Sequence, residues 1–180
     1  MDEIKEKSLT KEILGWVVYI VIVIILTYLV ITFVGVRTKV EGRSMENTLH
    51  DGDNLIVDKI SYRFRDPKRY EIIVFPYKYQ EDVYYIKRII GLPGETVQVI
   101  DGYVYIDGEK LDEDYGKEVM ETSGIAQEPI KLGEDEYFVL GDNRRVSKDS
   151  RDSEVGPVKK ENIAGHVVLR IWPLSKFGTP

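Results

Sequence analysis

The sequence predicts a mainly β protein, in which one N-terminal transmembrane helix is followed by a strongly bent antiparallel β-sheet or partial barrel. The run from Ile13 to Val36 contains no charged residue and is long enough to cross a bilayer as a helix. After Val36 the chain changes to short apolar runs separated by turn residues, and no long amphipathic helix competes with them. With 180 residues, the chain is long enough for one domain with a hydrophobic core of its own.

The uncharged run is expected to be a retained anchor over residues 13–36. Residues 1–12 before it are polar and mixed in charge, and Trp16 and Tyr19 lie near one end, where interfacial aromatic residues are common. A cleavable signal peptide is the competing interpretation. Its apolar core would be shorter and a small-residue cleavage site would follow, which Val34-Gly35-Val36 matches poorly.

The apolar runs after the anchor are expected to be β-strands, because they are short, apolar and bounded by turn residues. Asp101-Gly102 stands directly between two of these runs and is a strong hairpin signal, and Asp107-Gly108 suggests another turn. Within a smaller hairpin region of about residues 101–134, Asp112 to Pro129 is acidic and has little periodicity, so we interpret it as a surface excursion. The expected strands are 54–59, 71–75, 84–91, 96–100, 103–106, 137–140 and 164–172.

Composition excludes several classes of function. The net charge is -6 with acidic and basic residues interleaved, so no concentrated basic face exists and no nucleic-acid partner is expected. The chain has no cysteine, which excludes disulfides, thiolate metal sites and cysteine nucleophiles. It has only two histidines, so a histidine-rich metal site is not expected, and we predict no metal, nucleotide or other cofactor.

Ser44 follows Gly42-Arg43 where the chain leaving the membrane would enter the folded domain. A serine hydroxyl becomes a good nucleophile only when a nearby base takes its proton. His50 and His166 are candidates, although each position is more typical of a structural or exposed histidine. Lys87 lies in an apolar run, where burial would lower its pKa and leave a neutral amine to accept the proton. The residues alone leave open the alternative that Lys87 faces solvent on an edge strand.

Three segments, taken together and in order, resemble three segments of type I bacterial signal peptidases, the leader peptidase family with a serine-lysine dyad, in its compact single-span form. With the anchor, they account for most of the chain. The first is Gly42-Arg43-Ser44-Met45 followed by Thr48-Leu49 and Gly52-Asp53, the second runs from Tyr85 to Glu95, and the third is Gly141-Asp142-Asn143-Arg144 followed by Ser147 and Asp149-Ser150-Arg151.

The resemblance implies a role for individual residues. Ser44 would be the nucleophile and Lys87 the general base, with the Ser44 N–H as an oxyanion donor and Ser147 orienting the lysine amine. The implied supporting ion pairs involve Arg88, Asp142, Asp149 and Arg151, and the implied substrate pocket is formed by Val40, Met45, Leu49, Tyr85 and Ile86. Two positions depart from the family pattern: Gly42 stands where some relatives have serine, and Asn47 stands where the family usually has proline.

The implied function is that of a membrane-anchored serine endopeptidase, which removes signal peptides from secreted preproteins at Ala-X-Ala-type sites. The expected partners are secretory preproteins, membrane lipid and the secretion translocon. The expected location is the cell membrane, with a single span, residues 1–12 in the cytoplasm and a protease domain of residues 37–180 outside it. This orientation rests on the implied function, because lysines precede the span and basic residues also follow it.

Two alternatives belong to other classes of protein. One is a non-catalytic, membrane-anchored β domain that binds secreted or surface proteins. The other is a self-cleaving repressor with a serine-lysine site, but such a protein carries a DNA-binding helical module where this chain has a membrane span.

Overall fold

The computed structural model describes residues 2–33, 35–116 and 118–180, and its first element is the helix α1, Asp2–Phe33. The helix begins before the predicted span of 13–36, because the polar residues in front of Ile13 include no proline or glycine to interrupt it. It ends at Phe33; Val34 lies outside the described residues. The stretch Lys11–Tyr28 has a mean hydropathy of 1.9 and exposed side chains, so α1 has the length and composition to cross a membrane.

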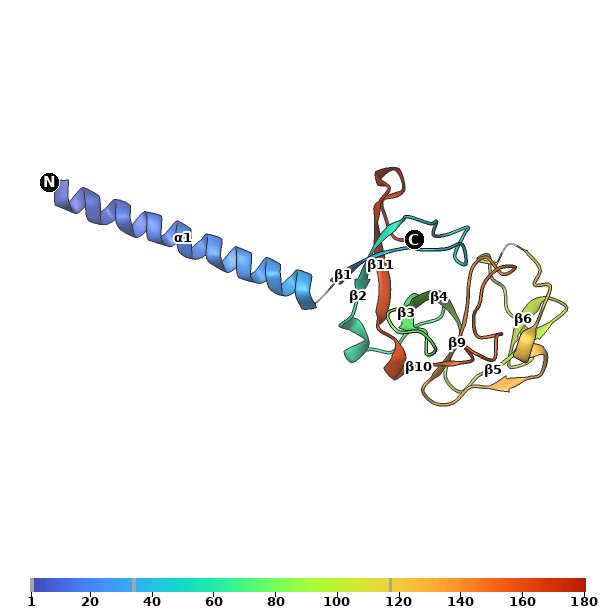
Figure 1. Ribbon diagram of the computed structural model, residues 1–180. Helices are drawn as coiled ribbons and strands as arrows, with labels where there is room; N and C mark the ends of the chain where they lie inside the picture. Colours follow the sequence, from blue (N-terminus) through green and yellow to red (C-terminus); the bar gives the residue numbers. More distant parts are fainter. Residues whose placement is uncertain (1, 34, 117) are drawn as a thin grey trace. The chain divides into compact units, whose positions relative to one another are not determined.

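The chain divides into two compact units, Met1–Val36 and Arg37–Pro180, and the second contains two β-sheets (Figure 1). The larger sheet has the order β1-β2-β11-β3-β4-β9-β10 and the smaller has the order β7-β6-β5-β8. One apolar helix followed by antiparallel sheets confirms the predicted fold class. The strands are β1 (Gly35–Lys39), β2 (Asn54–Asp58), β3 (Ile72–Pro76), β4 (Tyr84–Gly91), β5 (Thr96–Ile100), β6 (Tyr103–Ile106), β7 (Glu109–Lys110), β8 (Ile130–Lys131), β9 (Glu136–Leu140), β10 (Val158–Lys159) and β11 (Gly165–Trp172).

The long strand β11 connects the two halves of the larger sheet. It pairs with β2 along most of its length and with β3 through Gly165 and His166. Its register against β2 shifts between Val167 and Leu169, and irregularities of this kind bend a strand and increase its twist. The strand β2, which follows the Ser44 segment, is therefore connected through β11 to β3 and β4, the pair that contains Lys87.

The smaller sheet begins with the hairpin that the sequence predicts. Asp101 and Gly102 have φ angles of 51° and 78°, and the residues on either side, Ile100 and Tyr103, pair across the turn. Positive φ at both central residues is the conformation of a type I′ hairpin turn, which favours Asp-Gly. Figure 1 shows β5 and β6 at the opposite end of this unit from β2 and β11.

Separate core clusters support the two ends of the second unit. Val97, Val99 and Val104 of the smaller sheet pack with Phe138 and Leu140, and this contact joins that sheet to β9. A second cluster is formed by residues before and within the Ser44 segment together with strands of the larger sheet. Its buried members are Val40, Met45, Leu49, Leu55, Val57, Ile72, Val74 and Val167.

The segment from Asp112 to Pro129 differs from the predicted surface excursion, because part of it is buried. Met120 is 5% exposed and Ala126 is fully buried, and both belong to the core of the smaller sheet. The Met120 N–H donates a hydrogen bond to the Gly102 carbonyl at 3.2 Å. A loop that buries isolated apolar residues has no period of 2 or 3.6, so its pattern does not reveal the buried face. Residue 117 lies outside the described residues.

Candidate active site

Ser44 lies in a tight turn between β1 and β2. The Leu49 N–H donates to the Met45 carbonyl at 2.8 Å, and the Thr48 N–H donates to the same oxygen at 3.0 Å. The side chains of Met45 and Leu49 are 2% and 0% exposed and pack in the core with Val40. Apolar burial on both sides of the turn thus fixes its backbone, while the Ser44 side chain stays partly exposed.

Gly42 and Asn47, where the sequence departs from the pattern that it resembles, both have positive φ angles. Gly42 has a φ of 92°, and its N–H donates to Asp51 Oδ1 at 2.9 Å. Asn47 has a φ of 99°, which proline cannot adopt because its ring fixes φ near about −65°. Asparagine is among the residues that tolerate positive φ. The Ser44 turn therefore forms with Asn47, on a backbone that a proline at this position would not allow.

Lys87 lies on the central strand β4, which pairs with β3 on one side and β9 on the other. The alternative of a solvent-facing lysine on an edge strand is therefore wrong, and Lys87 is only 3% exposed. Its Nζ atom lies 2.8 Å from Ser44 Oγ and 3.0 Å from the carbonyl oxygen of Ile86. The amine and the hydroxyl are thus at the separation that direct proton transfer requires.

Burial lowers the pKa of Lys87 from its ordinary value of 10.5 to about 8, because the charged ammonium loses its hydration. The carboxylates of Asp149 and Asp142 act in the opposite direction, since negative charge favours the protonated amine. With a pKa of about 8, roughly a tenth of the amine is neutral at pH 7, against well under a thousandth for an unperturbed lysine. Lys87 can therefore accept a proton near neutral pH.

The contacts of both histidines are with residues other than Ser44. His50 is exposed, and its Nδ1 lies 3.4 Å from Lys176 Nζ. His166 is buried, its ring stacks on Tyr62 with centroids 4.8 Å apart, and its Nε2 lies 3.2 Å from an Arg65 nitrogen. Burial lowers the pKa of His166. In the described residues, the basic group within hydrogen-bond distance of Ser44 Oγ is Lys87.

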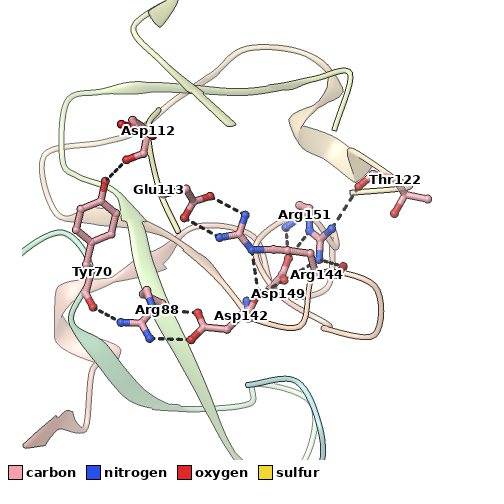
Figure 2. A network of polar contacts seen from close by, with 10 residues as sticks. Tyr70, Arg88, Asp112, Glu113, Thr122, Asp142, Arg144, Asp149 and Arg151 are labelled. Atoms are coloured by element: carbon pink, nitrogen blue, oxygen red, sulfur yellow. Dashed lines mark hydrogen bonds and ion pairs between the residues drawn. The ribbon is translucent and has the colours of Figure 1, made fainter. Parts of the chain in front are cut away.

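Arg88 of β4 forms a buried ion pair with Asp142 (Figure 2). Arg88 donates to both carboxylate oxygens of Asp142, at 2.9 and 2.7 Å, and these side chains are 3% and 0% exposed. Asp142 also accepts a hydrogen bond from Thr48 Oγ1 at 2.5 Å. One carboxylate thus holds the strand that contains Lys87 and the turn that contains Ser44.

A second buried pair fixes the loop of residues 141–151. Arg151 donates to both oxygens of Asp149, at 2.8 and 2.9 Å, and Asp149 accepts the Gly141 N–H at 3.1 Å. The Asn143 N–H in turn donates to the Ser44 carbonyl at 3.0 Å. Gly141 packs so closely that any side chain there would overlap the Ser44 carbonyl. The loop therefore contacts the Ser44 backbone directly.

A cleft of about 690 Å³ opens over Ser44 and Lys87. Two chain segments form most of its walls, residues 38–45 from β1 into the turn and residues 82–87 entering β4. Its remaining lining residues are Val146 and Lys148, from the loop that contacts Ser44. The ends of two strands, β1 and β4, lie along this cleft beside the serine hydroxyl and form a site suited to an extended peptide.

A family model described as "Signal peptidase, peptidase S26" matches residues 13–172. This chain belongs to that family. Relatives support the membership over nearly its whole length: the chain is 36% identical to signal peptidase I of Bacillus licheniformis over 184 residues and 38% identical to that of Bacillus amyloliquefaciens over 185 residues, each covering 98% of both chains. It is also 43% identical over 153 residues to the probable signal peptidase I-2 of Synechocystis, covering 82% of this chain and 67% of the relative.

The membership makes this chain a hydrolase of the signal peptidase I type, which removes signal peptides. It sets aside the non-catalytic binding domain and the self-cleaving repressor as alternatives. The same signal peptidase fold brings together most of the residues that the sequence analysis singled out. Lys87 bonds to Ser44, and the next residue, Arg88, pairs with Asp142. Asp149 and Arg151 are connected to the site through the loop at Gly141.

Two predicted residues lie differently from expectation. Leu49 is fully buried in the core and does not line the cleft, whereas Val40, Met45, Tyr85 and Ile86 do. The predicted hydrogen bond from Ser147 to Lys87 is not formed, since the amine is directed at Ser44 and Ile86. In the described part of the chain, the buried Oγ of Ser147 has no hydrogen-bond partner.

The sequence analysis missed Lys148, which lines the signal peptidase cleft and contacts an aromatic pair that includes Tyr85. Lys148 Nζ lies 2.9 Å from the Tyr77 hydroxyl, and the Tyr77 ring stacks on Tyr85 with centroids 4.7 Å apart. Glu154 completes this group by pairing with Lys148. The position of Lys148 directly after Ser147 was a usable signal, but Tyr77 lies far away in the sequence and only the fold brings it close.

Proposed function

We propose that this signal peptidase is a membrane-anchored serine endopeptidase with Ser44 as nucleophile and Lys87 as general base. The observation that carries the proposal is the 2.8 Å separation of Lys87 Nζ from Ser44 Oγ, with the amine buried and its pKa lowered to about 8. A lysine in this state can take the serine proton, which a solvated ammonium cannot.

The reaction then proceeds through an acyl-enzyme. Neutral Lys87 takes the proton as Ser44 Oγ attacks the carbonyl carbon before the scissile bond, and the Ser44 N–H donates to the developing oxyanion. The protonated lysine returns the proton to the leaving amine, which departs as the new N-terminus of the mature protein. A water molecule, deprotonated by the neutral lysine, then hydrolyses the ester and restores Ser44.

Ser147 is the proposed orienting residue for the lysine amine. Its buried Oγ has no partner among the described residues, and an unsatisfied buried hydroxyl costs about 1–3 kcal/mol. Gly141 packs against both the Ser147 side chain and the Ser44 carbonyl, so Ser147 lies beside the nucleophile's backbone. In this proposal the amine turns from the Ile86 carbonyl to the Ser147 hydroxyl while Ser44 attacks, which would give that hydroxyl a hydrogen-bond partner.

The proposed cleavage site is of the Ala-X-Ala type. Met45 and Ile86 supply apolar surface next to the catalytic pair, and the large ring of Tyr85 narrows the cleft beside Lys87, whose Nζ lies 4.9 Å from the ring centroid. Val40 extends the same wall toward β1. Side chains of this size leave shallow recesses, which admit alanine and exclude bulky residues. The peptide would lie extended between the walls, as in β-strand addition.

The proposed location is the cell membrane, with α1 as the anchor. Among the described residues, α1 is the one helix that is long and apolar enough to cross a membrane. With residues 1–12 in the cytoplasm and 37–180 outside it, enzyme and membrane-held preprotein would share one surface, which raises their effective concentration. The proposed partners are secretory preproteins, membrane lipid and the secretion translocon.

Cleavage of two matched preproteins tests the proposed specificity. They carry alanine or leucine immediately before the scissile bond, and mass spectrometry identifies the new N-terminus. We expect the detergent-solubilised protein to cleave the alanine form, and the leucine form about 10–200-fold more slowly, because excess side-chain volume is excluded. Equal rates for both substrates would contradict the small recess beside Met45 and Tyr85.

A further inference from the structure

Arg144 is a buried cation to which the catalytic steps above assign no role, and its counter-ion comes from a distant part of the chain. Glu113 accepts hydrogen bonds from both terminal nitrogens of the guanidinium, at 2.7 and 2.8 Å (Figure 2). The two side chains are 3% and 9% exposed, so the pair is shielded from water. Bidentate arginine-carboxylate pairs combine strong attraction with a fixed geometry.

Arg144 uses its other groups to hold the loop that contacts the nucleophile. Its Nε donates to the Gly141 carbonyl at 3.0 Å, while the Gly141 N–H is bound by Asp149. The Arg144 carbonyl accepts a hydrogen bond from Arg151 at 2.8 Å. Both polar groups of Gly141 are therefore fixed, at the point where the loop packs against the Ser44 carbonyl.

The segment that contains Glu113 fits closely against the site at further points. A methyl group on Gly116 would lie 2.5 Å from Arg144 Cζ, so the glycine allows the guanidinium to approach the backbone. The Tyr115 ring centroid lies 3.7 Å from Arg88 Cζ, within cation–π distance. Residues 113–116 thus contact two buried arginines near the catalytic pair, Arg88 on β4 and Arg144 on the loop.

We propose that Glu113 is a positioning residue for catalysis, which acts through Arg144 to hold the loop of residues 141–151 against Ser44. The inference rests on the proposed Ser44–Lys87 mechanism. Without the carboxylate, Arg144 is a buried cation with no counter-ion, and it moves toward water or binds other groups. The hydrogen bond from Arg144 to the Gly141 carbonyl then weakens, and the loop no longer has a fixed position against the Ser44 backbone.

Glu113→Gln is the test variant, because it keeps the size of the side chain and removes its charge. We expect kcat to fall about tenfold or more with KM within about twofold, since misplacement of reacting groups by about 1 Å can cost 10²-fold in rate. Glu121→Gln is the matched control: Glu121 lies in the same segment and pairs with Arg145 of the same loop at 2.9 Å, but the pair is 54% and 68% exposed. We expect wild-type kcat from this control.

A double variant tests whether Glu113 affects kcat through Arg144 or only through a general loss of stability. We expect the double variant Glu113→Gln with Arg144→Gln to have the same kcat as Arg144→Gln alone, because both substitutions remove one connection. Assays are run well below the melting temperature of each variant, and Glu113→Asp, which keeps the charge on a shorter side chain, should have an intermediate kcat.

Two results would overturn the inference. The first is a Glu113→Gln protein that has a lower melting temperature but the wild-type kcat. The second is a double variant whose loss of kcat equals the product of the losses in the two single variants. The dyad would survive either result. Conversely, an active Lys87→Arg enzyme would refute the dyad and leave the measured coupling of Glu113 to Arg144 unchanged.

Discussion

Lys87→Arg is expected to lower kcat/KM by about 10²–10⁴-fold, the typical contribution of a general base. Arginine keeps the positive charge and much of the length of lysine, but it stays protonated in proteins and cannot accept the Ser44 proton. The decrease in kcat/KM therefore measures the loss of a proton acceptor and not the loss of a positive charge. Initial rates of preprotein cleavage measure it, with circular dichroism to verify that the variant is folded.

Lys87→Ala should be equally inactive, and His50→Ala should keep most of its activity because His50 is exposed and bonds only weakly to Lys176. A folded Lys87→Arg enzyme with substantial turnover would falsify the serine-lysine dyad. An inactive, folded His50→Ala enzyme would instead identify a different base.

Asp142→Ala is expected to lower the free energy of unfolding of the β unit by about 3–5 kcal/mol, the cost of leaving one partner of a buried ion pair uncompensated. Arg88 is 3% exposed and donates to both Asp142 oxygens, so without the carboxylate its charge stays buried and unpaired. Thr48 also loses its acceptor. Urea unfolding followed by tryptophan fluorescence or circular dichroism measures the change.

Asp66→Ala is the control for this substitution. Asp66 pairs with Lys160 at 2.5 Å, but the two side chains are 81% and 37% exposed, so we expect a change within about 0.5 kcal/mol. If Asp142→Ala cost no more than this control, the Arg88–Asp142 pair would not be the connection that holds β4 to the Ser44 turn.

Strand positions were the most predictable part of the fold. The boundaries of β4, β5 and β6 agree with the apolar runs, because Pro93-Gly94, Asp101-Gly102 and Asp107-Gly108 supply turn chemistry next to β-branched residues. The strands β7, β8 and β10 were missed because each has only two residues, too few to form an alternating pattern.

The catalytic pair could be predicted only in part. The apolar neighbours of Lys87 indicated burial, but whether β4 was central or at an edge depended on β9, which the sequence does not place beside it. The pairing of Glu113 with Arg144 gave no local signal, since both lie among other charged residues and a charged loop is usually solvated. Contacts between distant segments decide these features, and periodicity reports only local structure.

The pH dependence of kcat/KM tests the central claim most directly, because it reports the ionisation of the base in the free enzyme. Lys87 is inactive while protonated, so the rate should rise with pH along an acidic limb with a pKa of about 8 and fall about tenfold per unit below it. Asp149→Asn removes a charge that raises the pKa of Lys87, so its limb should move to lower pH. A limb near the ordinary lysine value of 10.5, or one that Asp149→Asn moves to higher pH, would contradict a buried, neutral Lys87 as the base for Ser44.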